Sequence, residues 1–136
     1  KKICDFSQNN LHLVGYSGPY EGTISLNELK KHLYTLPNQP NAIPYITSYY
    51  KERWGFCMTQ EQFNTLEDGE YKVKINSTLI DGNLNYGELL IKGKSEKEIF
   101  LSTYICHPSM ANNELSGPVV LNALLDYIKK RYPKRY

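Results

Sequence analysis

Apolar residues and lysines alternate across residues 71–75, and this period of two predicts a half-buried β-strand. An Asp-Gly-Asn turn signal follows at 81–83, and a second mostly apolar stretch spans 86–91. Two such stretches joined by a tight turn are typical of a β-hairpin. The pattern therefore predicts a hairpin over residues 71–91.

The longest apolar run covers residues 99–106, where almost every position is apolar, β-branched or aromatic. Such a run predicts a central strand that is covered on both faces. A polar loop at 108–116 follows, and Gly117-Pro118 then opens an apolar helix that reaches about residue 131, with proline in its first turn. A strand, loop and helix in this order form half of a βαβ unit, which favours an α/β fold with a partial mixed or parallel sheet.

The N-terminal half is rich in glycine and proline turn signals. Short strands are predicted at 3–6 and 11–16. Ser25-Leu26-Asn27-Glu28 has the form of a capping box, which predicts a short helix over 26–34.

These patterns divide the chain into two parts. Residues 1–69 are interpreted as a small, β-rich inserted or lid-like segment, and residues 70–136 as the first part of an α/β domain. The periodicities are clearest in the second part, so we expect it to form the more stable unit.

Composition narrows the class of protein. The chain has 136 residues, of which 40% are hydrophobic, and a net charge of +2, which is too small for a nucleic-acid or membrane surface. No apolar run approaches the ~20 residues of a membrane span. Three cysteines without C-x-x-C spacing, and no export signal, predict free thiols and a cytoplasmic location. Because the chain starts at Lys1, we expect it to be a piece of a longer protein.

Candidate chemistry follows the predicted central strand. His107 ends that strand, and ligands of α/β proteins bind at the carboxyl ends of strands. The next loop supplies Asn113 and Glu114, and an imidazole with a nearby carboxylate is the donor set of a zinc site. The alternative is a histidine that serves only a structural hydrogen bond. Cys106 points to the opposite face of a strand and is not its nucleophilic partner.

Aromatic side chains crowd residues 43–58 without a helical period. Tyr49, Tyr50 and Trp54 could form a substrate-binding wall, or equally a half-exposed packing seam.

Several motifs carry a family resemblance that extends over about residues 8–131. They are Thr47-Ser48-Tyr49-Tyr50, Trp54-Gly55-Phe56-Cys57, Tyr86-Gly87-Glu88-Leu89-Leu90-Ile91, Cys106-His107-Pro108-Ser109 and Leu115-Ser116-Gly117. The chain resembles the zinc-dependent aminopeptidase family, and within it a bacterial branch of aminopeptidase-like proteins often encoded among polysaccharide-biosynthesis genes.

The resemblance implies a zinc-aminopeptidase-like (phosphorylase/hydrolase-like) α/β fold, bound zinc and hydrolysis of an N-terminal peptide bond. His107 matches a first zinc ligand, and Asn112-Asn113-Glu114 matches the metal-bridging loop. Two positions depart from the family. Ser109 replaces an orienting aspartate, and Asn113 replaces the bridging aspartate, whose charge a neutral amide does not supply.

Three readings follow for the whole protein. In the first it is a zinc-dependent aminopeptidase-like hydrolase, and the 136 residues alone hold no zinc, no catalytic residue and no activity, because the family's other ligands come later in the chain. In the second it is a non-catalytic module that recognises a peptide or sugar-related small-molecule ligand through the surface from Tyr45 to Trp54, which includes Tyr49 and Tyr50. In the third, an exposed sheet edge or the aromatic seam mediates assembly, for example into a homo-oligomer.

Overall fold

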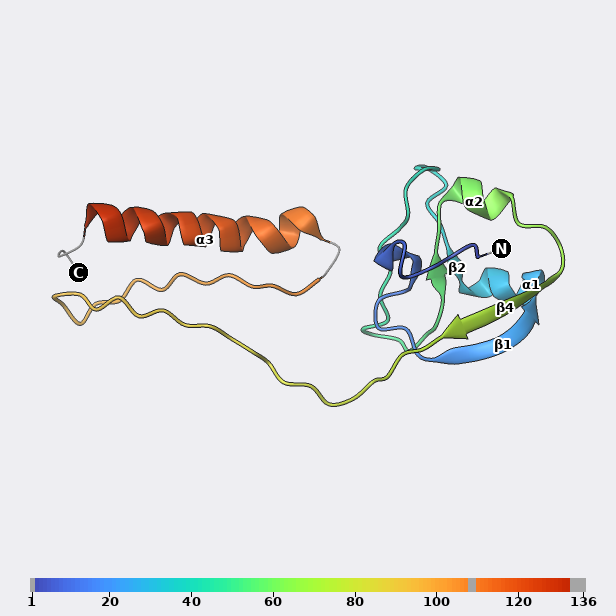
Figure 1. Cartoon of the computed structure of the whole chain (residues 1–136), viewed down its shortest axis with the longest axis horizontal. Coiled ribbons are helices and arrows are strands. Elements are labelled where there is room, and N and C mark those ends of the chain that lie inside the picture. The colour runs from blue at the N-terminus through green and yellow to red at the C-terminus, as the bar shows by residue number, and fades with distance from the viewer. Residues whose placement is uncertain (1, 108–109, 133–136) are drawn as a thin grey trace. The chain divides into compact units, whose positions relative to one another are not determined.

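The computed structural model describes residues 2–107 and 110–132. The chain divides into two compact units, Lys1–Gly82 and Asn83–Tyr136 (Figure 1). The elements of the first unit are η1 (Asn10–His12), β1 (Tyr20–Ser25), α1 (Leu26–Leu29), η2 (Lys30–His32), β2 (Leu33–Tyr34), β3 (Phe56–Cys57), α2 (Gln60–Asn64) and β4 (Glu70–Ile75). The second unit contains α3 (Ala111–Arg131). The division differs from the predicted boundary at 69/70, because β4 belongs to the first unit.

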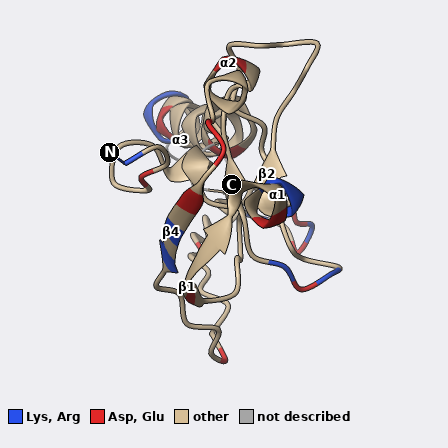
Figure 2. Cartoon of the chain, turned by 90° about the vertical axis from the view of Figure 1, so that its right-hand side faces the viewer, with Lys and Arg blue, Asp and Glu red and all other residues tan. Residues whose placement is uncertain are grey.

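The predicted strand at 71–75 is confirmed, but its predicted partner is wrong. β4 pairs antiparallel with β1, in a register that places Tyr20 opposite Ile75. Val73 and Ile75 are each 4% exposed, whereas the alternating Lys72 and Lys74 face solvent, and Figure 2 shows β4 carrying basic residues. The turn signal at 81–83 does not lead to the predicted hairpin, because pairing with β1 buries the apolar face of β4.

The core of the first unit lies between β4 and α1. Leu29, Val73 and Ile75 form its buried cluster. Partly buried side chains pack against it: Leu13, Tyr20, Ile24, Leu33, Trp54, Phe56 and Tyr71. The predicted cap is confirmed, because the Ser25 hydroxyl accepts a hydrogen bond of 3.3 Å from the Glu28 amide. The helix itself is shorter than predicted and passes through η2 into β2.

The strands predicted at 3–6 and 11–16 are not formed. Residues Asn10–His12 adopt a 3-10 turn, and the following residues make only isolated bridges, Leu13 with Phe56 and Gly15 with Thr47. The physical reason is that this segment bonds to separate loops, as when the Val14 amide donates to the Gly55 carbonyl at 3.1 Å. No continuous ladder can then develop.

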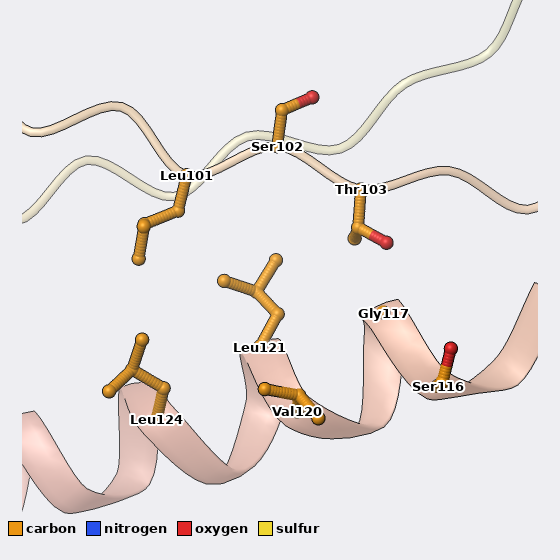
Figure 3. A pocket seen from close by; sticks show the side chains of 8 residues that line it. All are labelled: Leu101, Ser102, Thr103, Ser116, Gly117, Val120, Leu121 and Leu124. Carbon is orange, nitrogen blue, oxygen red and sulfur yellow. The ribbon is translucent and has the colours of Figure 1, made fainter.

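The second unit departs most from expectation. Residues 99–106 are extended beside α3 but form no strand, and neither do residues 86–91. Figure 3 shows Leu101 and Thr103 pointing toward α3 and Ser102 pointing away, as in a strand. Ile99 and Phe100 are 91% and 87% exposed, so the predicted two-sided cover is wrong for this unit. The reason is that no neighbouring strand is present within the described residues to complete a ladder.

Helix α3 begins at Ala111, six residues before the predicted start, and holds Pro118 inside it. Much of the predicted polar loop is therefore helical. The mixed α/β composition of the chain is confirmed, whereas the two small sheets, one antiparallel and one parallel, both lie in the first unit. Among the described helices none combines the length and apolar character needed to cross a membrane.

Candidate functional site

Glu114 is buried at the start of α3, where a solvated charge would be expected. Its side chain is 4% exposed. One carboxylate oxygen, Oε2, accepts a hydrogen bond from the backbone amide of Cys106. The other, Oε1, has no hydrogen-bond partner among the described residues. A buried polar atom without a partner is costly, and it calls for an explanation such as a bound ion.

Backbone hydrogen bonds bring this carboxylate to the residue that precedes His107. The Met110 amide donates to the His107 carbonyl at 3.3 Å, and the Glu114 amide donates to the Met110 carbonyl at 2.8 Å. These bonds fold the chain back, so that Glu114 reaches the amide of the residue directly before His107. The Glu114 carboxylate thus lies at the backbone of Cys106, one residue before the half-buried His107.

The third predicted ligand, Asn113, is directed elsewhere. Its side chain is exposed, and its Oδ1 accepts a hydrogen bond of 3.3 Å from the Tyr104 hydroxyl. Ser109, the predicted departure from the family's orienting aspartate, lies outside the described residues. In the part of the chain that the structure describes, no three histidine, cysteine or acidic side chains are grouped as a metal site.

The donor chemistry of His107 and Glu114 fits zinc, but their number does not complete its shell. An imidazole nitrogen and a carboxylate oxygen are ordinary zinc ligands, and a zinc site normally has at least three protein ligands. Two such ligands would fill only part of a zinc coordination shell, so a zinc site here would need further ligands from outside the described residues.

A pocket of about 370 Å³ lies between residues 101–103 and α3. Its wall is mostly leucine and valine, as Figure 3 shows, with hydroxyl groups of serine and threonine at one end. Thr103 lies directly over Gly117, where an added Cβ would overlap the Thr103 Oγ1. Glycine at this position allows the extended segment to approach the helix closely.

Trp54 is held between two rings. The His32 ring is stacked on it with centroids 3.6 Å apart, and the Tyr20 ring with centroids 4.0 Å apart. Two parallel rings at these distances cannot share one side, so they cover opposite faces of the indole. A ligand would have to meet the edge of Trp54, which favours a packing role for this predicted wall residue.

Tyr49 and Tyr50 lie at the surface beside the half-buried Tyr45 of the same aromatic run and the exposed Tyr16, which the sequence did not single out. We call Tyr16, Tyr45, Tyr49 and Tyr50 the tyrosine patch. The Tyr49 hydroxyl is hydrogen bonded to those of Tyr16 and Tyr45, and desolvation together with these bonds raises the pKa of Tyr49. Ring centroids are 4.7 Å apart between Tyr16 and Tyr49 and 6.4 Å apart between Tyr49 and Tyr50.

Tyr16 was missed because its position depends on the backbone of another loop. Its φ of 59° lies in the left-handed region, where an aromatic residue is uncommon. No sequence pattern predicts this conformation. The tyrosine-rich composition was the one available signal.

Two matches to known proteins extend over all or nearly all of this chain. A protein from Clostridium acetobutylicum named "Putative polysaccharide biosynthesis protein with aminopeptidase-like domain" is 48% identical over 139 residues, which is 100% of this chain and 32% of that protein. A crystal structure described as a "putative peptidase" from the same organism is 49% identical, has a TM-score of 0.87, and is matched over 96% of this chain and 31% of its own. The chain spans about a third of the length of these relatives.

A family model described as "Domain of unknown function (DUF2172)" matches residues 1–78, which is more than half of the chain and almost all of the first unit. The chain therefore belongs to the DUF2172 family.

Proposed function

We propose that this chain supplies two metal ligands, His107 and Glu114, to a zinc-dependent hydrolase of aminopeptidase type, and that the 136 residues alone are inactive. The observation that carries the proposal is Oε1 of a carboxylate that is 4% exposed, since this oxygen has no hydrogen-bond partner among the described residues. A cation on that oxygen would offset the cost of burying the charge.

The relatives support the same function. One carries an aminopeptidase-like domain in its name and the other is described as a peptidase, and both are about three times as long as this chain. The additional length is where the missing ligands would lie.

The residues have separable roles in this proposal. His107 and Glu114 would hold the metal, and the Cys106 amide would orient the Glu114 carboxylate through its Oε2. Zinc, when bound, supplies a water of lowered pKa and polarises the scissile carbonyl. This chain's own contribution is the position of the two ligands.

The test measures metal content of the longer protein after purification without chelator. We expect at least one zinc per chain, and a fall in affinity of about 10-fold or more in His107→Ala and in Glu114→Gln. Glu98→Gln, which changes a carboxylate in an exposed segment, is the matched control and should bind zinc normally. A metal-free protein, or a zinc affinity that is unchanged in His107→Ala, would contradict the hydrolase function.

The isolated chain gives an independent check. With two ligands against the four that zinc takes, it should bind zinc weakly and cleave no aminopeptidase substrate. Tight zinc binding by the 136 residues would contradict this division of ligands.

The second candidate is a non-catalytic binding module, and Asn113 favours it. A neutral amide stands at the bridging position and is already bonded to the Tyr104 hydroxyl. In the longer protein, Asn113→Asp should strengthen binding of a second metal ion if the loop still forms a two-metal site. Unchanged metal binding in this variant would support the binding module.

A further inference from the structure

The tyrosine patch is built on two loops that are fastened together through their backbones. The Gly15 amide donates to the Ile46 carbonyl at 2.8 Å, and the Ser48 amide donates to the Gly15 carbonyl at 3.0 Å. The Ser48 hydroxyl adds bonds to the carbonyls of Gly15 and Tyr16. The backbone that carries Tyr16 and leads into Tyr49 is therefore fixed by hydrogen bonds within the protein.

The backbone at Tyr16 is strained in a way that serves the patch. A φ of 59° places an aromatic residue in the left-handed region, where strain is commonly found at binding sites. This conformation places the Tyr16 ring 4.7 Å from that of Tyr49, with 46° between their planes. The fold thus maintains an unfavourable residue conformation next to the exposed rings.

The rings remain open to solvent despite this fixed arrangement. Tyr16 is 57% exposed, Tyr49 is 46% exposed, and Tyr50 is 103% exposed. The rings of Tyr49 and Tyr50 are inclined at 69°, which makes a corner of two aromatic surfaces. Rigid tyrosines with an apolar ring and a polar hydroxyl are efficient contact residues because they lose little conformational freedom on binding.

We propose that the tyrosine patch binds a neutral saccharide, with the rings of Tyr16, Tyr49 and Tyr50 against its C–H faces and phenol groups near its hydroxyls. This proposal deepens the binding-module function, on which it rests, and it is independent of the metal ligands.

The chemistry of the patch selects this ligand class. Its four side chains are phenols, which bring no cationic group to pair with a phosphate or carboxylate. The Gly15 and Ser48 amides already bond within the protein, so this part of the backbone cannot pair with an extended peptide as an added strand. Recognition is left to ring faces and hydroxyl groups, and a sugar presents apolar C–H faces beside hydroxyls.

The experiment applies the chain to an array of neutral oligosaccharides and follows the strongest hit by calorimetry. Tyr50→Ala removes a fully exposed ring without disturbing packing, and Tyr16→Gly removes a ring while placing the one residue that tolerates φ of 59°. Each should weaken binding at least about fivefold. Phe6→Ala, which removes a ring that is 61% exposed outside the patch, should bind like the unmodified chain.

Three outcomes overturn the proposal. The first is that no neutral saccharide binds, and the second is that a saccharide binds with the same affinity to both tyrosine variants as to the unmodified chain. The third is that these tyrosines are protected from chemical modification in the longer protein. Binding of a peptide at the patch would replace the ligand class and leave the binding function standing. Zinc content of the same preparations reports the metal site separately.

Discussion

Gly55 lies against the backbone of His32 so closely that an added Cβ would come within 2.5 Å of the His32 carbonyl oxygen. The contact belongs to a tight arrangement in which His32 Nδ1 bonds to the Trp54 carbonyl at 3.1 Å and the imidazole stacks on the indole. Backbone approach at this point brings β2 beside β3, and the parallel pairing of Leu33 with Phe56 depends on it.

Gly55→Ala should therefore destabilise the first unit by about 1–3 kcal/mol, because the new methyl group meets backbone rather than a movable side chain. Urea unfolding measures the change. Gly82→Ala is the matched control, since nothing lies within 4 Å of its Cβ position, and it should be nearly neutral. Equal stability of the two variants would contradict the close approach.

Leu29→Ala should cost about 2–5 kcal/mol of unfolding free energy, because Leu29 is 6% exposed in the buried cluster with Val73 and Ile75. Leu79→Ala removes the same atoms from a side chain that is 60% exposed, and its effect should be within about 0.5 kcal/mol. Thermal unfolding of both variants makes the comparison.

The three cysteines should differ in reactivity. All are free, with Cys57 buried, Cys4 half-buried and Cys106 exposed. Burial raises the pKa of Cys4 to about 12, with a further contribution from the neighbouring Cys57, and burial raises that of Cys57 to about 11. At pH 8 a thiol reagent should label Cys106 rapidly and the other two only after denaturation. Cys106→Ser should abolish the rapid phase.

The raised pKa of Cys57 predicts a loss of folding stability at alkaline pH. An unfolded thiol ionises near 9, whereas the folded Cys57 keeps its proton until about 11. Between pH 9 and 11 the folded state therefore keeps a proton that the unfolded state loses. The contribution of Cys57 to the unfolding free energy is complete below pH 9 and declines as the pH rises from 9 to 11. Unfolding free energies at pH 8 and 11 should differ less in Cys57→Ala than in the unmodified chain. Parallel pH dependences would argue against this contribution.

Hydrogen exchange should be slower in β4 than in residues 99–106. The β4 amides lie in a paired strand with a buried face, whereas 99–106 forms no strand and carries exposed apolar side chains. Slow exchange at 99–106 would indicate strand pairing there, as in the expectation that residues 70–136 form the stable unit.

The sequence alone determined the features that depend on near neighbours. The alternation at 71–75 predicted β4, and Ser25 and Glu28 predicted the start of α1. In each case residues a few positions apart settle the outcome through side-chain period or a local hydrogen bond.

Only the tertiary structure decided what depends on distant partners. β4 pairs with β1 instead of 86–91, Tyr16 joins Tyr49 across two loops, and the apolar run at 99–106 has no strand beside it. These features are stabilised by burial of surface against segments that are far away in sequence. A local pattern indicates that a segment needs a partner, but it does not identify which segment the partner is.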